Sequence, residues 1–411
     1  MKIKDLKARE ILDSRGNPTV EVELTIEDGR KVVASTPSGA STGDKEALEL
    51  RDNDPKRYNG KGVLNAVNNI NGIIRDNLIG AELNQRRIDN ALISIDGTPN
   101  KKSLGANATL AVSLAALKAS ALANNKELYE YVSNGKVSLP LLMVNILNGG
   151  VHADNNLDIQ EFMIVPLIRT FKERLRASSE IYHALKSILK EKKLLTGVGD
   201  EGGFAPSLNN HKEALELIVK AIEKAGYKPG RQVYIALDVA ASSFYNADYD
   251  RYLFEGKKIT GAKLLEYYQE IIKEYPIISI EDAFAESDIN NIQKLTALYK
   301  NKILIVGDDY FVTNKNMLQD GIDKKYCNGV IIKPNQIGTI SETCDTIKLA
   351  YMNNYKMIMS HRSGETEDTA IADLVCGLNI PFIKTGSVAR GERIAKYNRL
   401  LKIEEDLLNR K

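Results

Sequence analysis

Apolar and polar residues alternate near the start of the chain. Every second position from Val20 to Ile26 is apolar, and the positions between them are polar. This period of two is typical of a strand with one buried face. Glu27-Asp28-Gly29 is a turn signal, and the apolar pattern resumes over Lys31–Ser35. The segment is therefore predicted to form a β-hairpin.

The pattern then becomes helical. Residues 61–78 and the alanine-rich segment 105–122 have apolar positions at helical spacing, and the glycine-containing segment 39–43 before them is predicted to be a flexible loop. Residues 133–135 look like a linker. We expect a small α+β domain over residues 1–134 and a larger domain over residues 135–411.

The larger domain has a different rhythm, in which short apolar runs are separated by helix-like segments such as Gly261–Glu274. The runs are 233–237, 276–280, 303–307, 330–332, 357–360 and 381–383. Repeated strand–helix units build a parallel sheet, and this many of them close into a barrel. The predicted fold class is therefore α/β, with a (β/α) barrel as its larger part.

Each of these runs is followed by a charged or polar residue. In chain order the residues are Asp238, Glu281, Asp308, Lys333, His361-Arg362 and Lys384. A single polar residue after a strand means little, but six consecutive units argue against coincidence. The carboxyl ends of barrel strands face one another, so these side chains are expected to converge in one pocket.

The residue types in this pocket indicate a reaction class. Three carboxylates, from Asp238, Glu281 and Asp308, suit Mg²⁺ and leave positions open for substrate. Lys333 is a candidate base beside such an ion. Together with phosphate-binding side chains at 361–363, this set fits abstraction of a proton next to a carboxylate. A Schiff-base aldolase would also suit a barrel, but it would not need three carboxylates.

Composition narrows the classes further. Among 411 residues, 56 Lys+Arg against 54 Asp+Glu give a net charge of +2, which argues against nucleic-acid binding. Three scattered cysteines indicate reduced thiols and a cytoplasmic location. No signal peptide is expected, and no apolar run is expected to reach membrane-spanning length. Residues 246–250 begin like a calcium loop but lack its Gly and Glu, so a surface hairpin is expected there.

Ten short motifs, in order from about Ile3 to Leu408, resemble the enolase family, in its bacterial type. They are residues 13–23, 37–43, 104–107, 148–162, 198–206, 279–282, 307–309, 333–338, 360–368 and 384–386. The resemblance implies a (β/α)8-type barrel whose first units are irregular, capped by the N-terminal α+β domain. It also implies phosphopyruvate hydratase activity, the reversible loss of water from 2-phosphoglycerate to give phosphoenolpyruvate.

The resemblance also implies roles for individual residues. Lys333 would take the C2 proton and Glu201 would protonate the departing C3 hydroxyl. Two Mg²⁺ ions would bind and stabilise the enediolate, the first held by Asp238, Glu281 and Asp308, and the second joined by Ser41. The residues expected to contact substrate are His152, Gln160, Glu161, Glu281, Asp308, Lys333, His361, Arg362, Ser363 and Lys384, with Arg362 and Ser363 on phosphate and Lys384 on the carboxylate.

Val151, Ser243 and Tyr310 depart from the usual family pattern, but none of them is assigned to chemistry. Members of the family are dimers, or octamers in some bacteria, so a homo-oligomer is expected. An acid-sugar dehydratase or racemase is a weaker alternative, because it would normally lack the phosphate motif at 360–363. Another alternative is a cell-surface role in which lysines such as Lys411 bind host plasminogen.

Overall fold

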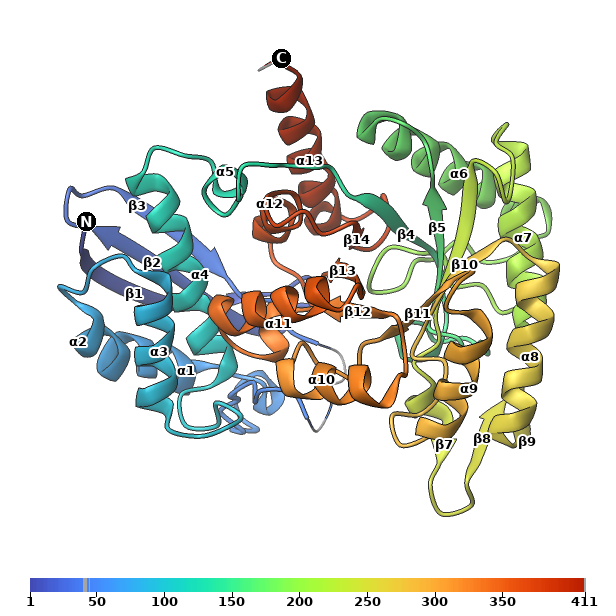
Figure 1. The fold of residues 1–411 in the computed structure, drawn as a ribbon, viewed down its shortest axis with the longest axis horizontal. Helices are drawn as coiled ribbons and strands as arrows, with labels where there is room; N and C mark the ends of the chain where they lie inside the picture. Colours follow the sequence, from blue (N-terminus) through green and yellow to red (C-terminus); the bar gives the residue numbers. More distant parts are fainter. Residues whose placement is uncertain (40–42, 44, 410–411) are drawn as a thin grey trace.

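The structure is a computed structural model that describes residues 1–39, 43 and 45–409. It places a small sheet with its helices beside a larger barrel (Figure 1), in blue to cyan and in green to red respectively. The arrangement agrees with the predicted α/β barrel and smaller N-terminal part. The boundary at residues 134 and 135 stays a prediction.

The N-terminal part contains an antiparallel sheet of β1 (Ile3–Leu12), β2 (Pro18–Ile26) and β3 (Lys31–Ser35). The predicted hairpin is confirmed, with Leu24 paired to Val32 across β2 and β3. Strand β1 was not predicted, because its charged residues interrupt the apolar alternation. Its buried Leu6 pairs with Leu24 and completes the apolar face of the sheet.

Helical segments follow the sheet. They are η1 (Tyr58–Gly60), α1 (Leu64–Asn69), η2 (Ile70–Ile74), α2 (Arg75–Leu78), α3 (Gln85–Asp96), α4 (Ala106–Ala123) and α5 (Leu128–Tyr131). Of these, α4, α1, η2 and α2 contact the strands of the sheet. The predicted helix over residues 61–78 is broken into short pieces, because Gly72 departs from helical backbone angles (φ −107°, ψ −105°). The predicted alanine-rich helix is confirmed as α4.

Helix α4 corrects one expectation from the sequence. Its 18 residues have a mean hydropathy of 1.3, so by length and composition it is able to cross a membrane. However, 83% of it is buried inside the protein, where it contacts β2 and β3. A helix that is apolar on all sides is typical of a buried position, and the alanines give α4 this character. We therefore interpret α4 as the core helix of the N-terminal part.

The larger part is a closed barrel of eight strands in the spatial order β10-β11-β12-β13-β14-β4-β5-β6. All six predicted runs are strands of this barrel. They are β6 (Val233–Asp238), β10 (Ile277–Glu281), β11 (Leu304–Gly307), β12 (Gly329–Ile332), β13 (Lys356–Ser360) and β14 (Phe382–Lys384). The sequence rhythm therefore located these strands within about one residue.

The remaining two strands, β4 (Leu141–Asn148) and β5 (Glu161–Pro166), were not predicted. Strand β5 is antiparallel to both β4 and β6, so the sheet is not parallel throughout. Its reversal brings its first residue, Glu161, opposite Asp238, the last residue of β6. Because β5 is antiparallel to its neighbours, its first residue, Glu161, lies at their carboxyl ends.

An outer ring of helices surrounds the barrel (Figure 1). It consists of α6 (Phe171–Glu191), α7 (His211–Lys224), α8 (Gly261–Glu274), α9 (Ile289–Tyr299), α10 (Lys315–Lys324), α11 (Ile340–Met352), α12 (Ala370–Gly377) and α13 (Gly391–Asn409). The short helices η3 (Gly150–His152), η4 (Ala241–Phe244) and η5 (Pro334–Gln336) follow barrel strands. A small sheet of β7 (Tyr245–Asn246), β8 (Arg251–Phe254) and β9 (Lys257–Ile259) lies outside, and confirms a hairpin at 246–250.

Candidate active site

Alternation along the barrel strands decides which residues face the interior. A buried apolar cluster fills the barrel and contains Met143, Met163, Val165, Ala236, Val306, Ile331, Ile358 and Phe382. Side chains two positions apart on a strand share a face. Two residues beyond Ala236, Val306, Ile331 and Phe382 stand Asp238, Asp308, Lys333 and Lys384. The charged residues therefore lie next to this apolar cluster, at the carboxyl end of the barrel.

These residues line one pocket. Its walls are Glu46, His152, Gln160, Glu161, Glu201, Asp238, Ala240, Asp282, Asp308, Asp309, Lys333, Ser360, His361, Arg362, Ser363 and Lys384. Nearly every predicted site residue is in this set. Glu281 joins it through its contact with Lys384, and Ser41 lies outside the described residues.

Lys384 is buried at the centre of the carboxylates. Its Nζ lies 2.7 Å from Asp238 Oδ2, 3.0 Å from both oxygens of Glu281 and 3.2 Å from Glu161 Oε1. Burial opposes the charged form of this lysine, but the carboxylates outweigh it and hold the pKa of Lys384 well above its usual value. Lys384 is therefore a fixed positive charge in the pocket.

Lys333 contacts Asp308, whose other oxygen, Oδ1, accepts a hydrogen bond of 2.8 Å from Gln336. Burial disfavours the charge on Lys333, yet Asp308 outweighs burial and raises the pKa of the lysine. Burial likewise opposes ionisation of Asp308, but Lys333 lowers the pKa of that carboxyl. In this pairing Lys333 keeps its proton at neutral pH. A group that draws Asp308 away from it would make the lysine a better base.

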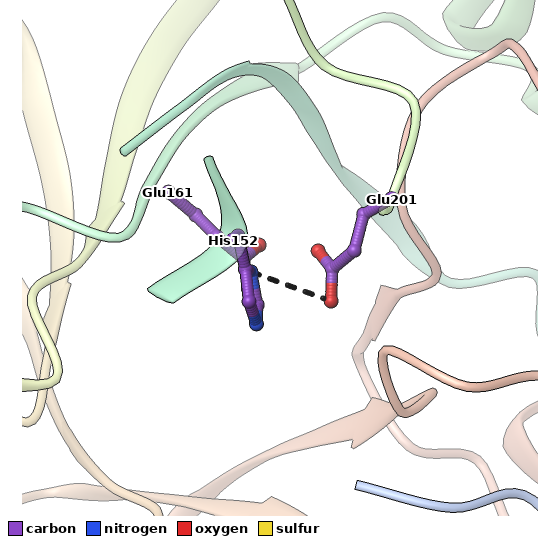
Figure 2. A group of neighbouring side chains, drawn as sticks. All are labelled: His152, Glu161 and Glu201. Carbon is purple, nitrogen blue, oxygen red and sulfur yellow. Dashed lines mark ion pairs between the residues drawn. The ribbon is translucent and has the colours of Figure 1, made fainter. Parts of the chain in front are cut away.

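Glu161 and Glu201 form a second buried group with His152 (Figure 2). The Nδ1 of His152 lies 3.7 Å from an oxygen of each glutamate. Burial, then the charge of Glu201, raises the pKa of Glu161 well above its usual value. Ligand atoms of the three side chains lie within 4.8 Å of one another. Two buried carboxyl groups in one site disfavour double ionisation, so one of them retains a proton. The pair can therefore hold a proton at neutral pH and still present an ionised oxygen.

Glu201 is held on its other sides as well. Asn145 Nδ2 donates a hydrogen bond of 3.0 Å to Oε2, and His361 Nε2 lies 3.3 Å from Oε1. Burial raises the pKa of Glu201, but the neighbouring histidines outweigh burial and lower it. Asn145 is a residue that sequence reasoning missed. It lies two positions beyond Met143 on β4, and a correct prediction of that strand would have found it.

Arg362 forms a bidentate ion pair with Glu46, with oxygen–nitrogen distances of 2.7 and 3.2 Å. Both side chains are buried at the junction of the barrel with the N-terminal part. Planar guanidinium groups bind carboxylate and phosphate with the same geometry. The carboxylate of Glu46 thus orients Arg362 in a way that also suits a phosphate group. Glu46 was not predicted, since its segment carries no periodic signal.

Asp282 and Asp309 lie in the motifs 279–282 and 307–309, which predict no role for them. Asp282 has left-handed backbone (φ +43°), and its carboxylate accepts hydrogen bonds from the amides of Asp308 and Asp309 at 2.9 and 3.0 Å. It thereby fixes the direction in which Asp308 enters the pocket. Burial, followed by the charge of Asp308, raises the pKa of Asp309 to about 7.

The donor set fits a divalent cation. Ligand oxygens of Asp282, Asp308 and Asp309 lie within 4.8 Å of one another, and Asp238 and Glu281 converge on Lys384 beside them. Hard carboxylate oxygens in this number suit Mg²⁺. Burial, followed by the charge of Asp238, raises the pKa of Glu281 to about 8, so this carboxyl binds a proton when no cation compensates its neighbours.

Binding of Mg²⁺ should therefore release protons. At pH 7 Glu281, with its pKa of about 8, is mostly protonated, and a cation ligand must be ionised, so we expect release of about one proton per pocket. At pH 9 the carboxyl is already ionised and release should vanish. Calorimetric titration in buffers of different ionisation enthalpy measures this number. Equal release at both pH values would contradict the prediction, and Glu281→Gln should abolish it.

A closed barrel with a charged pocket at the carboxyl ends of its strands is typical of enzymes of the (β/α)-barrel class. Two family models match the chain in succession. "Enolase, N-terminal domain" matches residues 3–132, and "Enolase, C-terminal TIM barrel domain" matches residues 136–411. The chain belongs to the enolase family.

This membership confirms the resemblance drawn from the ten motifs. It makes the protein a hydro-lyase, of the phosphopyruvate hydratase type, within glycolysis. The family acts on a small-molecule substrate and depends on Mg²⁺. Whether the chain is of the bacterial type stays a prediction.

Proposed function

We propose that this enzyme interconverts 2-phosphoglycerate and phosphoenolpyruvate. The observation that carries the proposal is that one pocket brings together Lys333 with Asp308 and Arg362 with Ser363, in a chain of the enolase family. The first pair suits proton abstraction and the second suits binding of a phosphate. The family match disfavours the acid-sugar dehydratase and racemase alternative.

Lys333 is the proposed base for the C2 proton. It is partly buried, follows the end of β12, and contacts Asp308, a proposed metal ligand. Its raised pKa belongs to the pairing with Asp308. A cation that shares Asp308 would withdraw negative charge from Lys333 and lower its pKa, which favours the neutral amine.

Glu201 is the proposed acid for the C3 hydroxyl. Its neighbour Glu161 retains a proton, because burial and the charge of Glu201 raise the pKa of Glu161. Asn145 and His361 orient the carboxylate of Glu201. In the direction of dehydration the pair supplies a proton to the leaving hydroxyl. In the reverse direction the same pair takes a proton from water, so one group of residues serves both directions.

Asp238, Glu281 and Asp308 are the proposed ligands of a first Mg²⁺, and a second would be joined by Ser41. When bound, the ion stabilises negative charge that develops on the substrate carboxylate. Lys384 adds its own fixed charge to that end of the pocket. Arg362 and Ser363 would bind the phosphate, with Glu46 giving up its ion pair to it.

The proposal is tested by following ultraviolet absorbance as 2-phosphoglycerate is converted to phosphoenolpyruvate. We expect formation of product that requires Mg²⁺ and stops when the ion is chelated. A flat trace from folded protein with Mg²⁺ present would refute the proposal. The same trace with phosphoenolpyruvate as starting material should fall, because the reaction is reversible.

The proposed homo-oligomer, dimer or octamer, stays a prediction, as do the cytoplasmic and cell-surface locations. For plasminogen binding, the residue singled out in the sequence, Lys411, lies outside the described residues. No feature of the described chain favours that role over catalysis.

A further inference from the structure

Arg393 is a fully buried arginine on α13 that reaches the candidate active site from behind. Its Nη1 lies 2.7 Å from His361 Nδ1 and donates to the carbonyl of Arg362 at 2.6 Å. Its Nη2 donates to the carbonyl of Asp200 at 3.3 Å. One guanidinium therefore joins the loop after β13 to the segment that carries Glu201.

The chemistry of the guanidinium decides where the proton of His361 lies. An arginine side chain donates hydrogen bonds and accepts none. The Nδ1 of His361 must therefore be the acceptor and carry no proton, which leaves the ring proton on Nε2. Burial, with help from the charge of Arg393, lowers the pKa of His361 to about 4, so the ring is neutral at physiological pH.

The Nε2 of His361 faces the pocket. It lies 3.3 Å from Glu201 Oε1, it is buried, and it has no well-aligned hydrogen bond to any described residue. A buried N–H group without a hydrogen-bond partner costs folding free energy, so we expect this group to donate to an acceptor in the pocket. The acceptors within reach are Glu201 and a substrate oxygen bound next to it.

We propose that Arg393 is a positioning residue, which holds His361 as the neutral tautomer protonated on Nε2 and so presents an N–H donor to the pocket beside Glu201. Without the arginine, the ring can place its proton on Nδ1 and turn a lone pair toward the carboxylate. The tautomer stands on the contacts of Arg393 alone. Its effect on turnover rests on the proposed role of Glu201.

The tautomer is measured directly by nitrogen NMR on protein labelled with ¹⁵N-histidine, which contains only four histidines. In the unmodified enzyme we expect His361 with a protonated Nε2 and an unprotonated Nδ1. A ring with its proton on Nδ1, or with two protons, overturns the proposal. This measurement needs no variant and no turnover, so it stands apart from the test of the proposed function.

Variants then separate positioning from general support of the loop. Arg393→Ala should give mixed tautomers and lower kcat by about 10- to 100-fold, with little change in KM. Arg393→Lys, which keeps one donor, should recover part of both. The control is Lys396→Met. Lys396 is equally buried on α13, but it donates to the backbone carbonyl of Thr366 and does not contact the ring of His361.

Lys396→Met should leave the His361 spectrum as in the unmodified enzyme. If it produced the same mixed tautomers as Arg393→Ala, loosening of the loop would explain both and the proposal would fall. An Arg393→Ala spectrum identical to that of the unmodified enzyme would overturn it too. If Arg393→Ala does not fold, Arg393→Lys and the unmodified enzyme still decide the question.

Discussion

Replacing Lys333 by alanine should reduce turnover of 2-phosphoglycerate by about 10³-fold or more, because the substitution removes the proposed base. Binding of Mg²⁺ should stay nearly intact, since the proposed ligands Asp238, Glu281 and Asp308 are untouched. The two quantities are measured separately, by steady-state kinetics and by calorimetric titration with the ion.

Exchange of the C2 proton with solvent gives the sharper readout, because it reports proton abstraction even when later steps are slow. The Lys333→Ala enzyme should show none. Measurable exchange in that variant would take the base assignment away from Lys333. Lys333→Arg is the matched control: it keeps a cation next to Asp308 but cannot act as a base at neutral pH, so it should be as inactive as alanine.

Replacing Asp308 by asparagine should weaken Mg²⁺ binding and turnover together. Loss of an outer partner of a metal site costs about 10- to 100-fold in affinity, so loss of a direct ligand charge should cost at least about 100-fold. The substitution also removes the anion that raises the pKa of Lys333, which by itself would make the lysine a better base. A fall in activity would therefore be due to the metal and not to the base.

The neighbouring Asp309 provides the matched control. It lines the same pocket and its carboxylate lies within 4.8 Å of Asp308, but the proposed ligands of the first Mg²⁺ are Asp238, Glu281 and Asp308. Asp309→Asn should leave the Mg²⁺ titration close to that of the unmodified enzyme. If Asp308→Asn gave an unchanged titration and Asp309→Asn a weakened one, the cation would belong to the group formed by Asp282 and Asp309 instead.

The sequence located those parts of the site that local rules determine. An apolar run that ends in Asp238 or Lys384 places that residue at the carboxyl end of the barrel, next to the buried apolar cluster. This follows because alternation along a strand is fixed by backbone geometry. The reversed direction of β5 is not encoded in this way. Nothing within residues 161–166 distinguishes a parallel from an antiparallel strand, and only pairing with β6 decides it.

The residues that were missed depend on contacts between distant segments. Glu46 meets Arg362, and Arg393 meets His361, only after the chain has folded. Neither contact leaves a spacing signal in the sequence. Asp282 was present in a recognised motif, but its role in orienting Asp308 follows from a left-handed backbone angle that no residue pattern announces.

The barrel closes where β14 pairs with β4, the strands at opposite ends of its sequence. The helix that follows, α13, then places Arg393 behind the pocket. During synthesis on the ribosome the N-terminal part can fold early, but the barrel remains open until its last strand has left the exit tunnel. From the synthesis of β4 until that point, the edge of β4 that pairs with β14 stays unpaired. A chain terminated before α13 would be a target for chaperones and proteases and not a partly active enzyme.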